Sequence, residues 1–311
     1  MTRISDAALT HLQSVAFADG DRYSLTEAIG EGGMGVVYRA LDTELGRAVA
    51  VKVLRAPTDA GLAARFRQEA RVLARLEHPG IVPVHDAGVL ADGRAFYVMM
   101  LVRGQPLDAR ARELATLPER LRLFQRICEP VAFAHSHQVI HRDLKPANIM
   151  VGPFGEVLVM DWGVAKVLGV AEHPANASGG EGVHTGHGTV LGTPGYMAPE
   201  QAAGATAEID HRADQYALGA MLTELLEGLE APRAVHAIAA KAMAAAPDAR
   251  YGSVMELSAD LDRFLDGDPV EAYPESAMER LARVVSRHRT AIILVLAYLL
   301  MRLVLLLFRG P

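Results

Sequence analysis

The chain has 311 residues, half of them hydrophobic, and a formal net charge of -6, which allows one large domain or two smaller ones packed across a cleft. The mild negative charge argues against nucleic acid as a partner, because nucleic-acid binding usually requires a basic face. A single cysteine, Cys128, excludes a disulfide within the chain, and no Cys/His cluster has the spacing of a zinc site.

The first part of the chain is expected to be rich in strands. Residues 1–22 form a short extension without the basic stretch and apolar run of a signal peptide. β-branched and aromatic runs then surround a glycine cluster and a turn at Gly46, which predicts an antiparallel meander. The expected strands are 23–29, 36–40 and 48–54. Apolar residues in 63–76 recur with helical spacing and stop just before Pro79, so one helix follows.

Beyond Gly104 helices dominate. The expected helices are 118–136, 206–227, 232–246 and 253–265. Residues 171–188 are mainly Gly, His, Ala, Ser and Asn, so they are predicted to form a mobile loop. The sequence thus predicts an α+β architecture in which a small β-rich lobe is joined to a larger α-rich lobe.

Two features near the N-terminus indicate phosphate chemistry. The spacing of Gly30, Gly32 and Gly35 lets a strand-turn-strand backbone approach phosphate oxygens. An ordinary glycine hairpin is the alternative, while a Rossmann motif is disfavoured because a strand follows instead of a helix. Lys52 lies within an apolar strand, where an unpaired ammonium would be costly. It therefore needs an anion, either Glu69 in the following helix or a polyphosphate.

Two carboxylates and an amide follow in the second part of the chain. Asp143 and Asn148 precede a predicted hairpin, and Asp161 follows it. Such an arrangement can place hard oxygen ligands and a proton acceptor around one point. Magnesium-assisted phosphoryl transfer requires both.

The sequence His-Arg-Asp-Leu-Lys-Pro-Ala-Asn at 141–148, followed by Asp-Trp-Gly at 161–163, resembles the catalytic loop and magnesium-binding motif of protein kinases. Residues 192–200 resemble the end of a kinase activation segment, and 214–219 the start of the central helix. Arg250 resembles the arginine that pairs with the Glu200 type of residue. The resemblance runs from about Tyr23 to Leu265 and is to bacterial eukaryotic-like (Hanks-type) Ser/Thr kinases.

The resemblance implies a two-lobed kinase domain at 23–266, with the N-lobe at about 23–102 and the C-lobe at about 103–266. Asp143 would orient or deprotonate the substrate hydroxyl, and Lys145 would neutralise the moving γ-phosphate. Lys52, fixed by Glu69, would hold the α- and β-phosphates of ATP, and Asn148 with Asp161 would hold Mg²⁺. The implied nucleotide pocket contains Gly30, Gly32, Gly35, Val37, Ala50, Lys52, Met99, Met100 and Val102. For each apolar residue alone, plain core packing is the alternative.

Substrate and regulation follow from the same resemblance. Lys145 and Thr193 match the Ser/Thr-specific variant, so the expected substrates are proteins bearing Ser or Thr. Arg142 beside the catalytic aspartate implies that phosphate on the activation loop orders it. The candidate acceptors are Thr185 and Thr189, with Ser178 less favoured, and a homodimer could serve trans-autophosphorylation.

Two departures from the family pattern affect these expectations. Trp162 replaces the usual phenylalanine, and its indole is expected to fill the same apolar slot against Leu73 and His141. Only three residues separate Gly228 from Pro232. The chain therefore lacks much of the loop and helix that family members place there and often use for docking. A pseudokinase or docking protein is therefore the main alternative, although Lys52, Asp143 and Asp161 are retained. A small-molecule phosphotransferase is disfavoured by the peptide-positioning segment 192–200.

The C-terminal end is strongly apolar. Residues 291–308 are interrupted only by Tyr298 and Arg302, which predicts a transmembrane helix at 290–308. The segment 267–289 is basic and resembles the juxtamembrane sequence of kinases from planctomycete-like bacteria. The positive-inside rule then predicts a single-pass protein of the inner membrane with its kinase domain in the cytoplasm. A helix packed on a partner or on the kinase lobe is the alternative.

Overall fold

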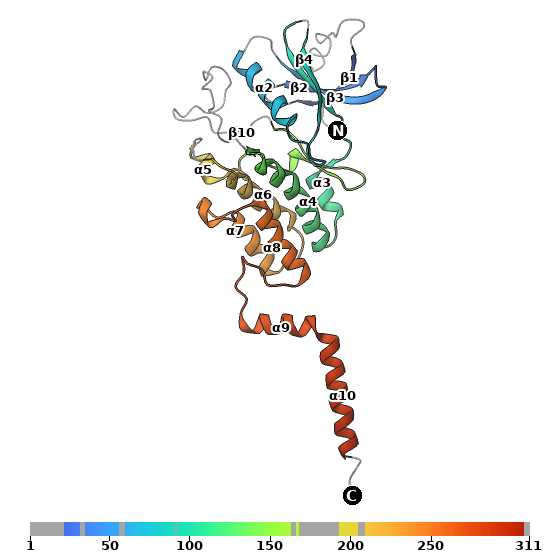
Figure 1. Cartoon of the computed structure of the whole chain (residues 1–311), viewed down its shortest axis with the longest axis vertical. Helices are drawn as coiled ribbons and strands as arrows, with labels where there is room; N and C mark the ends of the chain where they lie inside the picture. The colour runs from blue at the N-terminus through green and yellow to red at the C-terminus, as the bar shows by residue number, and fades with distance from the viewer. Residues whose placement is uncertain are drawn as a thin grey trace.

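The computed structural model describes residues 22–31, 35–55, 60–90, 92–162, 166–167, 193–204 and 209–307. A smaller lobe built around a sheet lies above a larger helical lobe, and two C-terminal helices extend from the far end of the larger lobe (Figure 1). The expected α+β organisation is therefore confirmed.

The N-lobe is a five-stranded antiparallel sheet with strand order β1-β2-β3-β5-β4. Its strands are β1 (Tyr23–Glu31), β2 (Gly35–Asp42), β3 (Arg47–Leu54), β4 (Val84–Val89) and β5 (Ala95–Met100). Gly46 forms the turn between β2 and β3 with φ +63°, a conformation that glycine adopts without strain. The predicted meander is thus confirmed, whereas β4 was not predicted because its sequence, Val-His-Asp-Ala-Gly-Val, has few strand-forming residues.

Strand β3 separates two packed regions, because side chains alternate between the two faces of a strand. Val49, Val51 and Val53 are buried in the cluster formed with β1 and β2. Lys52 and Leu54 point to the opposite face, toward helix α2 (Ala60–Leu73) and the larger lobe. This alternation places a lysine on the cleft side of an otherwise apolar strand.

The C-lobe is built around helix α4, whose buried residues recur at helical spacing. Thr116 and Glu119 form a capping box at its N-terminus. The helices of this lobe are α3 (Leu107–Glu113), α4 (Leu117–Ser136), α5 (Pro199–Ala202), α6 (Arg212–Leu225), α7 (Arg233–Ala242) and α8 (Val254–Asp266). Two small sheets complete it: β6 (Gln105–Pro106), β8 (Ile149–Val151) and β9 (Val157–Val159) form one, and β7 (Val139–Ile140) and β10 (Lys166–Val167) the other.

Two predicted helices were too long. Helix α7 ends at Ala242 instead of continuing to residue 246, because Ala246 precedes Pro247 and is extended at φ -80° and ψ 125°. The Arg250 guanidinium binds the carbonyl oxygens of Ala244 and Ala245 at 2.8 and 3.3 Å. Helix α6 begins at Arg212, where the Asp210 carboxylate accepts the Arg212 backbone N–H at 2.8 Å. Only residues 226–232 connect α6 to α7, as the short spacing in the sequence predicted.

The C-terminal segment forms helices α9 (Ala277–Arg287) and α10 (Arg289–Leu307). Within the described part of the chain, no helix is both long enough and apolar enough to span a bilayer. The predicted transmembrane helix at 290–308 is therefore not confirmed. The uncharged run between Arg289 and Arg302 is only about 18 Å long at 1.5 Å per residue, against a hydrocarbon core of about 30 Å.

Candidate active site between the two lobes

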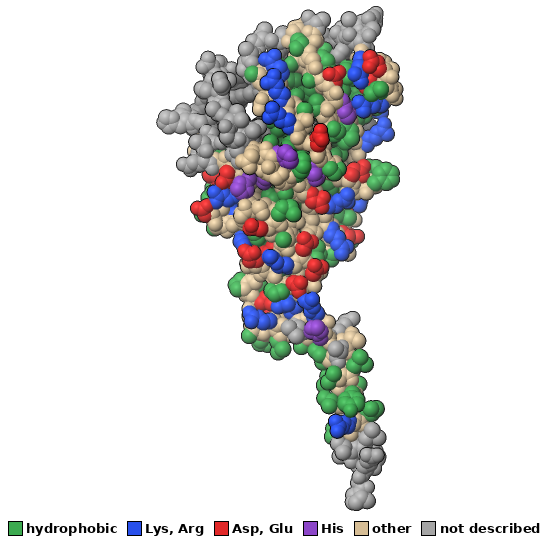
Figure 2. Space-filling model, in the orientation of Figure 1, with side chains coloured by type: hydrophobic (Ala, Val, Ile, Leu, Met, Phe, Trp, Pro, Cys, Tyr) green, Lys and Arg blue, Asp and Glu red, His purple; other side chains and the backbone are tan. Residues whose placement is uncertain are grey.

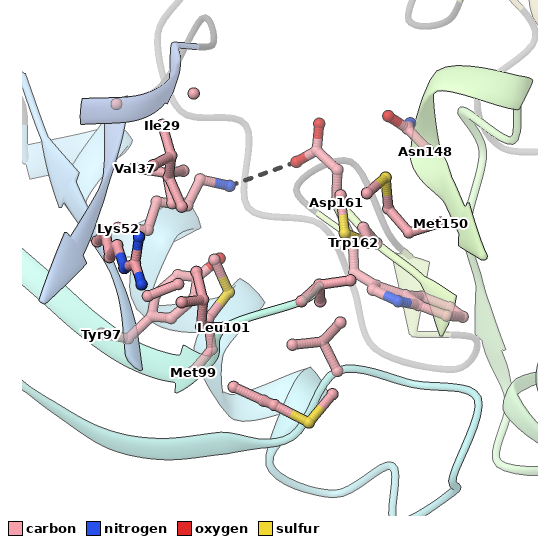
Figure 3. Close-up of a pocket in the computed structure, with 18 of the residues that line it drawn as sticks. Ile29, Val37, Lys52, Tyr97, Met99, Leu101, Asn148, Met150, Asp161 and Trp162 are labelled. Carbon is pink, nitrogen blue, oxygen red and sulfur yellow. Dashed lines mark hydrogen bonds and ion pairs between the residues drawn. The ribbon is translucent and has the colours of Figure 1, made fainter. Parts of the chain in front are cut away.

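A cavity of about 940 Å³ lies between the lobes. Its N-lobe wall is formed by β1, β2, β3 and β5 with the end of α2, and its floor includes Asp143, Asn148 and Asp161 of the C-lobe. Figure 3 shows Lys52 and Asp161 pointing toward one another across this space, with Asn148 beyond Asp161. Residues from both lobes therefore converge on one cavity of a size typical for small-molecule sites.

Most residues predicted to line a nucleotide pocket line this cavity. The residues of that set that line it are Gly30, Gly35, Val37, Ala50, Lys52, Met99, Met100 and Val102. Gly32 lies outside the described residues. A Cβ at Gly35 would lie 2.3 Å from the carbonyl oxygen of Val53, so close pairing of β2 with β3 requires glycine there whatever the cavity binds.

Lys52 is held by two carboxylates. Its Nζ donates to Glu69 Oε1 at 2.8 Å and to Asp161 Oδ1 at 3.3 Å. The hydroxyl of Tyr97 also donates to Glu69 Oε1 at 2.8 Å. Burial alone would lower the pKa of Lys52, but the charges of Glu69 and Asp161 outweigh it and the pKa is raised. Lys52 is thus a fixed cation at the cavity wall.

Asp143, Lys145 and Thr193 form a closed triangle of hydrogen bonds on the floor of the cleft. Lys145 Nζ donates to Asp143 Oδ2 at 2.7 Å and to Thr193 Oγ1 at 2.8 Å. The Thr193 hydroxyl in turn donates to Asp143 Oδ1 at 2.8 Å. Both carboxylate oxygens are therefore oriented by neighbouring donors, which prepares the group to accept a proton from a bound hydroxyl.

The backbone around Asp143 is held by a buried carboxylate of helix α6. Asp214 accepts the backbone N–H groups of His141 and Arg142 at 2.9 and 2.8 Å, and its Oδ2 lies 2.7 Å from His135 Nε2. Burial alone would raise the pKa of Asp214, but hydrogen bonds from His135 and the backbone lower it. These contacts stabilise Arg142 at φ +71°, a conformation that is costly for a residue with a side chain.

Asn148 and Asp161 offer the oxygen atoms that a hard cation requires. The Asn148 Nδ2 donates to the backbone oxygen of Asp143 at 2.9 Å, so its Oδ1 remains as the ligating atom. The Asp161 carboxylate is half exposed toward the cavity. Among the residues described, no cluster of three or more His, Cys, Asp or Glu could hold a metal ion. Mg²⁺ is usually bound by one or two protein oxygens together with substrate phosphates, which this pair fits.

Trp162 occupies the apolar slot predicted for it. The side chain is buried, its ring centroid lies 4.7 Å from that of His141, and it belongs to the same packed cluster as Leu73. Its Nε1 donates to the carbonyl oxygen of Val159 at 3.3 Å. The indole therefore fills the slot and satisfies its polar atom while Asp161, with φ +58°, faces the cleft.

The end of the activation segment is anchored to the C-lobe by two contacts. Arg250 and Glu200 form a bidentate ion pair at 2.7 and 2.9 Å, as predicted. The side chain of Gln201 accepts the Ala198 N–H at 3.2 Å and donates to the carbonyl oxygen of Arg142 at 2.9 Å. Residues 198–201 are thereby linked directly to the catalytic loop.

Several contributors were missed at the sequence level. Ile29 and Met150 line the cavity from opposite lobes (Figure 3). Met150 could have been found, because it lies two residues after Asn148. Tyr97 and Gln201 carry no local sequence signal, since their partners are distant in the chain. The candidate phosphorylation sites Thr185, Thr189 and Ser178 lie outside the described residues.

Comparison with known proteins agrees with this geometry. Residues 23–265 match the family model described as the protein kinase domain. The chain is 38% identical over 81% of its length to a probable serine/threonine-protein kinase of Streptomyces coelicolor, covering 41% of that protein. It is also 38% identical over 81% of its length to the serine/threonine-protein kinase PknB of Mycolicibacterium smegmatis, covering 44% of it.

A third relative is the serine/threonine-protein kinase PknD of Chlamydia trachomatis, 35% identical over 80% of this chain and covered over 32% of its own length. The chain thus spans less than half the length of these relatives. The family match covers most of the chain and includes every element that lines the cavity. The chain belongs to the protein kinase family.

Proposed function

We propose that this protein transfers the γ-phosphate of ATP to serine or threonine hydroxyls of other proteins. The observation that carries the proposal is the convergence of the Asp143–Lys145–Thr193 triangle with Lys52 and Asp161 at one cavity. The names of the relatives, all Ser/Thr kinases, support the same reaction.

The two lobes supply different groups to the cleft: nucleotide-binding residues come mainly from the N-lobe and the catalytic residues from the C-lobe. Val37, Ala50 and Met150 enclose an apolar space suited to an adenine ring, and Lys52 supplies a fixed positive charge for phosphate oxygens. Asp143 accepts a hydrogen bond from the incoming hydroxyl and takes its proton as the bond from that oxygen to the γ-phosphorus forms and the bond to the bridging oxygen breaks, which releases ADP. Lys145, adjacent to Asp143, offsets negative charge on the transferred group.

Asn148 and Asp161 would hold Mg²⁺, which neutralises phosphate charge when it is bound. Thr193 contacts both Asp143 and Lys145, so it would position the base relative to the charge-neutralising lysine. Lys145 and Thr193 match the Ser/Thr-specific kinase pattern, which supports serine or threonine as the acceptor in place of tyrosine.

The reaction can be tested by incubating the purified protein with γ-labelled ATP, Mg²⁺ and a generic acceptor protein, then identifying the labelled amino acid after hydrolysis. Label on phosphoserine or phosphothreonine is expected for the wild type. The Asp143→Asn variant should lose label, whereas Asp266→Asn, at an exposed carboxylate at the end of α8, should retain it. Label on phosphotyrosine, or equal label with Asp143→Asn, would contradict the proposal.

The same labelling experiment distinguishes an active kinase from a pseudokinase. A protein that binds ATP in the cleft but gives no label, under conditions where an unrelated kinase labels the same acceptor, would favour a docking role. The short α6–α7 connection would then be the first region to examine for partner contacts.

A further inference from the structure

Helix α9 exposes an apolar face on one side. Met278, Leu281 and Val285 are spaced three and four residues apart, so they lie on one face of the helix. Their exposed fractions are 82%, 65% and 45%. Figure 2 shows hydrophobic side chains on the side of α9 that faces away from the catalytic domain, with basic side chains on the near side. The helix is thus strongly amphipathic, and its apolar side has no cover within the described chain.

The polar side of α9 is held by ion pairs to residues 267–276, the linker between α8 and α9. Arg283 pairs with Glu275 at 2.9 Å, and Arg287 pairs with Asp268. Ser276 and Glu279 form reciprocal hydrogen bonds that begin the helix, with the Ser276 N–H donating to Glu279 at 2.9 Å. These contacts turn the arginine side of α9 toward the linker and therefore aim the apolar side outward.

The linker is itself anchored to the C-lobe. The buried carboxylate of Asp260 accepts the backbone N–H groups of Glu271 and Ala272 at 2.7 and 3.0 Å. Lys241 of α7 pairs with Glu271 at 2.8 Å, and Val270 is buried. A chain of contacts thus runs from the catalytic domain to α9 and sets the direction in which its apolar face points.

Helix α10 continues the apolar surface and turns sharply away from α9 (Figure 1). Residues 293–296 and 298–301 are apolar or aromatic, and each is more than half exposed. Consecutive residues on a helix point in all directions, so this surface surrounds α10 completely. A second protein helix would cover one stripe of it, whereas a lipid phase covers every side.

The charge around the two helices favours an anionic partner. Residues 277–289 contain four arginines and one glutamate. Arg283 and Arg287 also pair with Glu275 and Asp268, so lipid headgroups would compete with these carboxylates for two of the four arginines.

Arginine side chains beside an apolar helical face are typical of helices that lie in the headgroup region of anionic bilayers. We propose that α9 lies flat in the interface of an anionic membrane, with Met278, Leu281 and Val285 toward the acyl chains and its arginine side toward the headgroups and the catalytic domain. This arrangement does not depend on the phosphotransfer reaction.

The proposal can be tested with a polarity-sensitive dye on the full chain. Cys128 is fully buried, and burial raises the pKa of its thiol, so a thiol-reactive dye should label an introduced exposed cysteine selectively. Leu281→Cys places the dye on the apolar face, and Arg280→Cys places it one residue away on the polar side. Vesicles of phosphatidylcholine alone and with phosphatidylglycerol are then added.

With phosphatidylglycerol vesicles, the dye at 281 should shift its emission to the blue and be quenched by a lipid-soluble quencher, while the dye at 280 should remain in a polar environment. Phosphatidylcholine alone should bind at least about tenfold more weakly. Equal behaviour of the two positions, or no shift at 281, would overturn the proposal. A blue shift that grows with protein concentration without vesicles would instead identify a second copy as the partner.

Two double variants distinguish a specific effect of the α9 apolar face on vesicle binding from a general effect of added negative charge. Met278→Glu with Leu281→Glu should reduce binding to phosphatidylglycerol vesicles by about tenfold or more, because two charged groups replace the apolar face. Met255→Glu with Leu45→Glu makes the same changes at positions that are each 59% exposed elsewhere in the catalytic domain, and it should leave binding unchanged. Equal losses from both pairs would contradict a specific role for α9.

Discussion

The hydroxyl of Thr193, near the end of the activation segment, donates to Asp143 Oδ1 at 2.8 Å, fifty residues away in sequence. The contact joins the segment that would present a substrate to the carboxylate that would accept its proton. It also places Lys145 between the two residues. The geometry of the catalytic carboxylate therefore depends on a residue outside the catalytic loop.

Replacing Thr193 with valine should impair the chemical step. The change removes one donor to Asp143 and one acceptor for Lys145 while keeping the shape, and hydrogen bonds to charged groups contribute about 1.5–3 kcal/mol. The expected result is a fall in kcat of about 10-fold to 100-fold, with Thr193→Ser close to the wild type. Steady-state kinetics at saturating ATP measures it. An unchanged kcat for Thr193→Val would show that Asp143 does not need this contact.

Replacing Glu69 with glutamine should weaken nucleotide binding. Glu69 is buried and supplies one of the two carboxylates at Lys52, so the lysine would move toward Asp161 when that charge is lost. The expected result is a rise in Kd for Mg-ATP of about tenfold. Calorimetric titration measures it, with exposed Glu256→Gln on α8 as the control. Tyr97→Phe removes a second hydrogen bond to Glu69 and should have a smaller effect in the same direction.

Replacing Arg250 with methionine should destabilise the C-lobe. The Arg250 side chain is fully buried and its partner Glu200 nearly so, and removing one partner of a buried ion pair typically costs about 3–5 kcal/mol. Urea unfolding should show that loss. The double variant Arg250→Met with Glu200→Gln should recover part of it, because no unpaired buried charge remains. A single variant as stable as the wild type would contradict the role of this pair.

Stability should fall at acid pH partly through Asp260. Burial would raise the pKa of Asp260, but hydrogen bonds from the backbone of Glu271 and Ala272 and from Tyr251 lower it below the ordinary value of 3.8. A lowered folded-state pKa means that its stabilisation is present above the unfolded pKa and is lost as pH falls through the folded value. Asp260→Asn should therefore flatten the acid limb of the unfolding free energy, measured from pH 6 to pH 3. The neighbouring Asp266→Asn should leave that limb unchanged.

Most residues that the sequence singled out meet in the cleft, because each lies in a short motif of fixed spacing, while their roles stay predictions. Asp143, Lys145 and Asn148 occur within six residues, and Lys52 is set on its face by strand alternation. Contacts between residues that are distant in the sequence could not be predicted. Tyr97, Gln201 and the Thr193–Asp143 contact depend on segments that meet only in the folded chain.

Two helix limits were predicted wrongly because proline and a local side-chain contact near the helix ends were not taken into account. The predicted end of α7 lies directly before Pro247, where the chain is extended at Ala246. The transmembrane prediction at 290–308 is not confirmed: it set the cost of Arg302 against the apolar gain of the whole run, and no helix among the described residues is long and apolar enough to span a bilayer. The planctomycete-like subgroup and the phosphorylation sites stay predictions.

The most direct test of the central claim is a calorimetric titration with ATP, with and without Mg²⁺, of the wild type and of Asp161→Asn. If residues of both lobes form one nucleotide site, the wild type should bind one ATP per chain, more tightly with Mg²⁺. Asp161→Asn should lose most of the Mg²⁺-dependent gain, because the carboxylate opposite Lys52 is then absent. No ATP binding by the wild type, or the same Mg²⁺ dependence in the variant, would contradict the account.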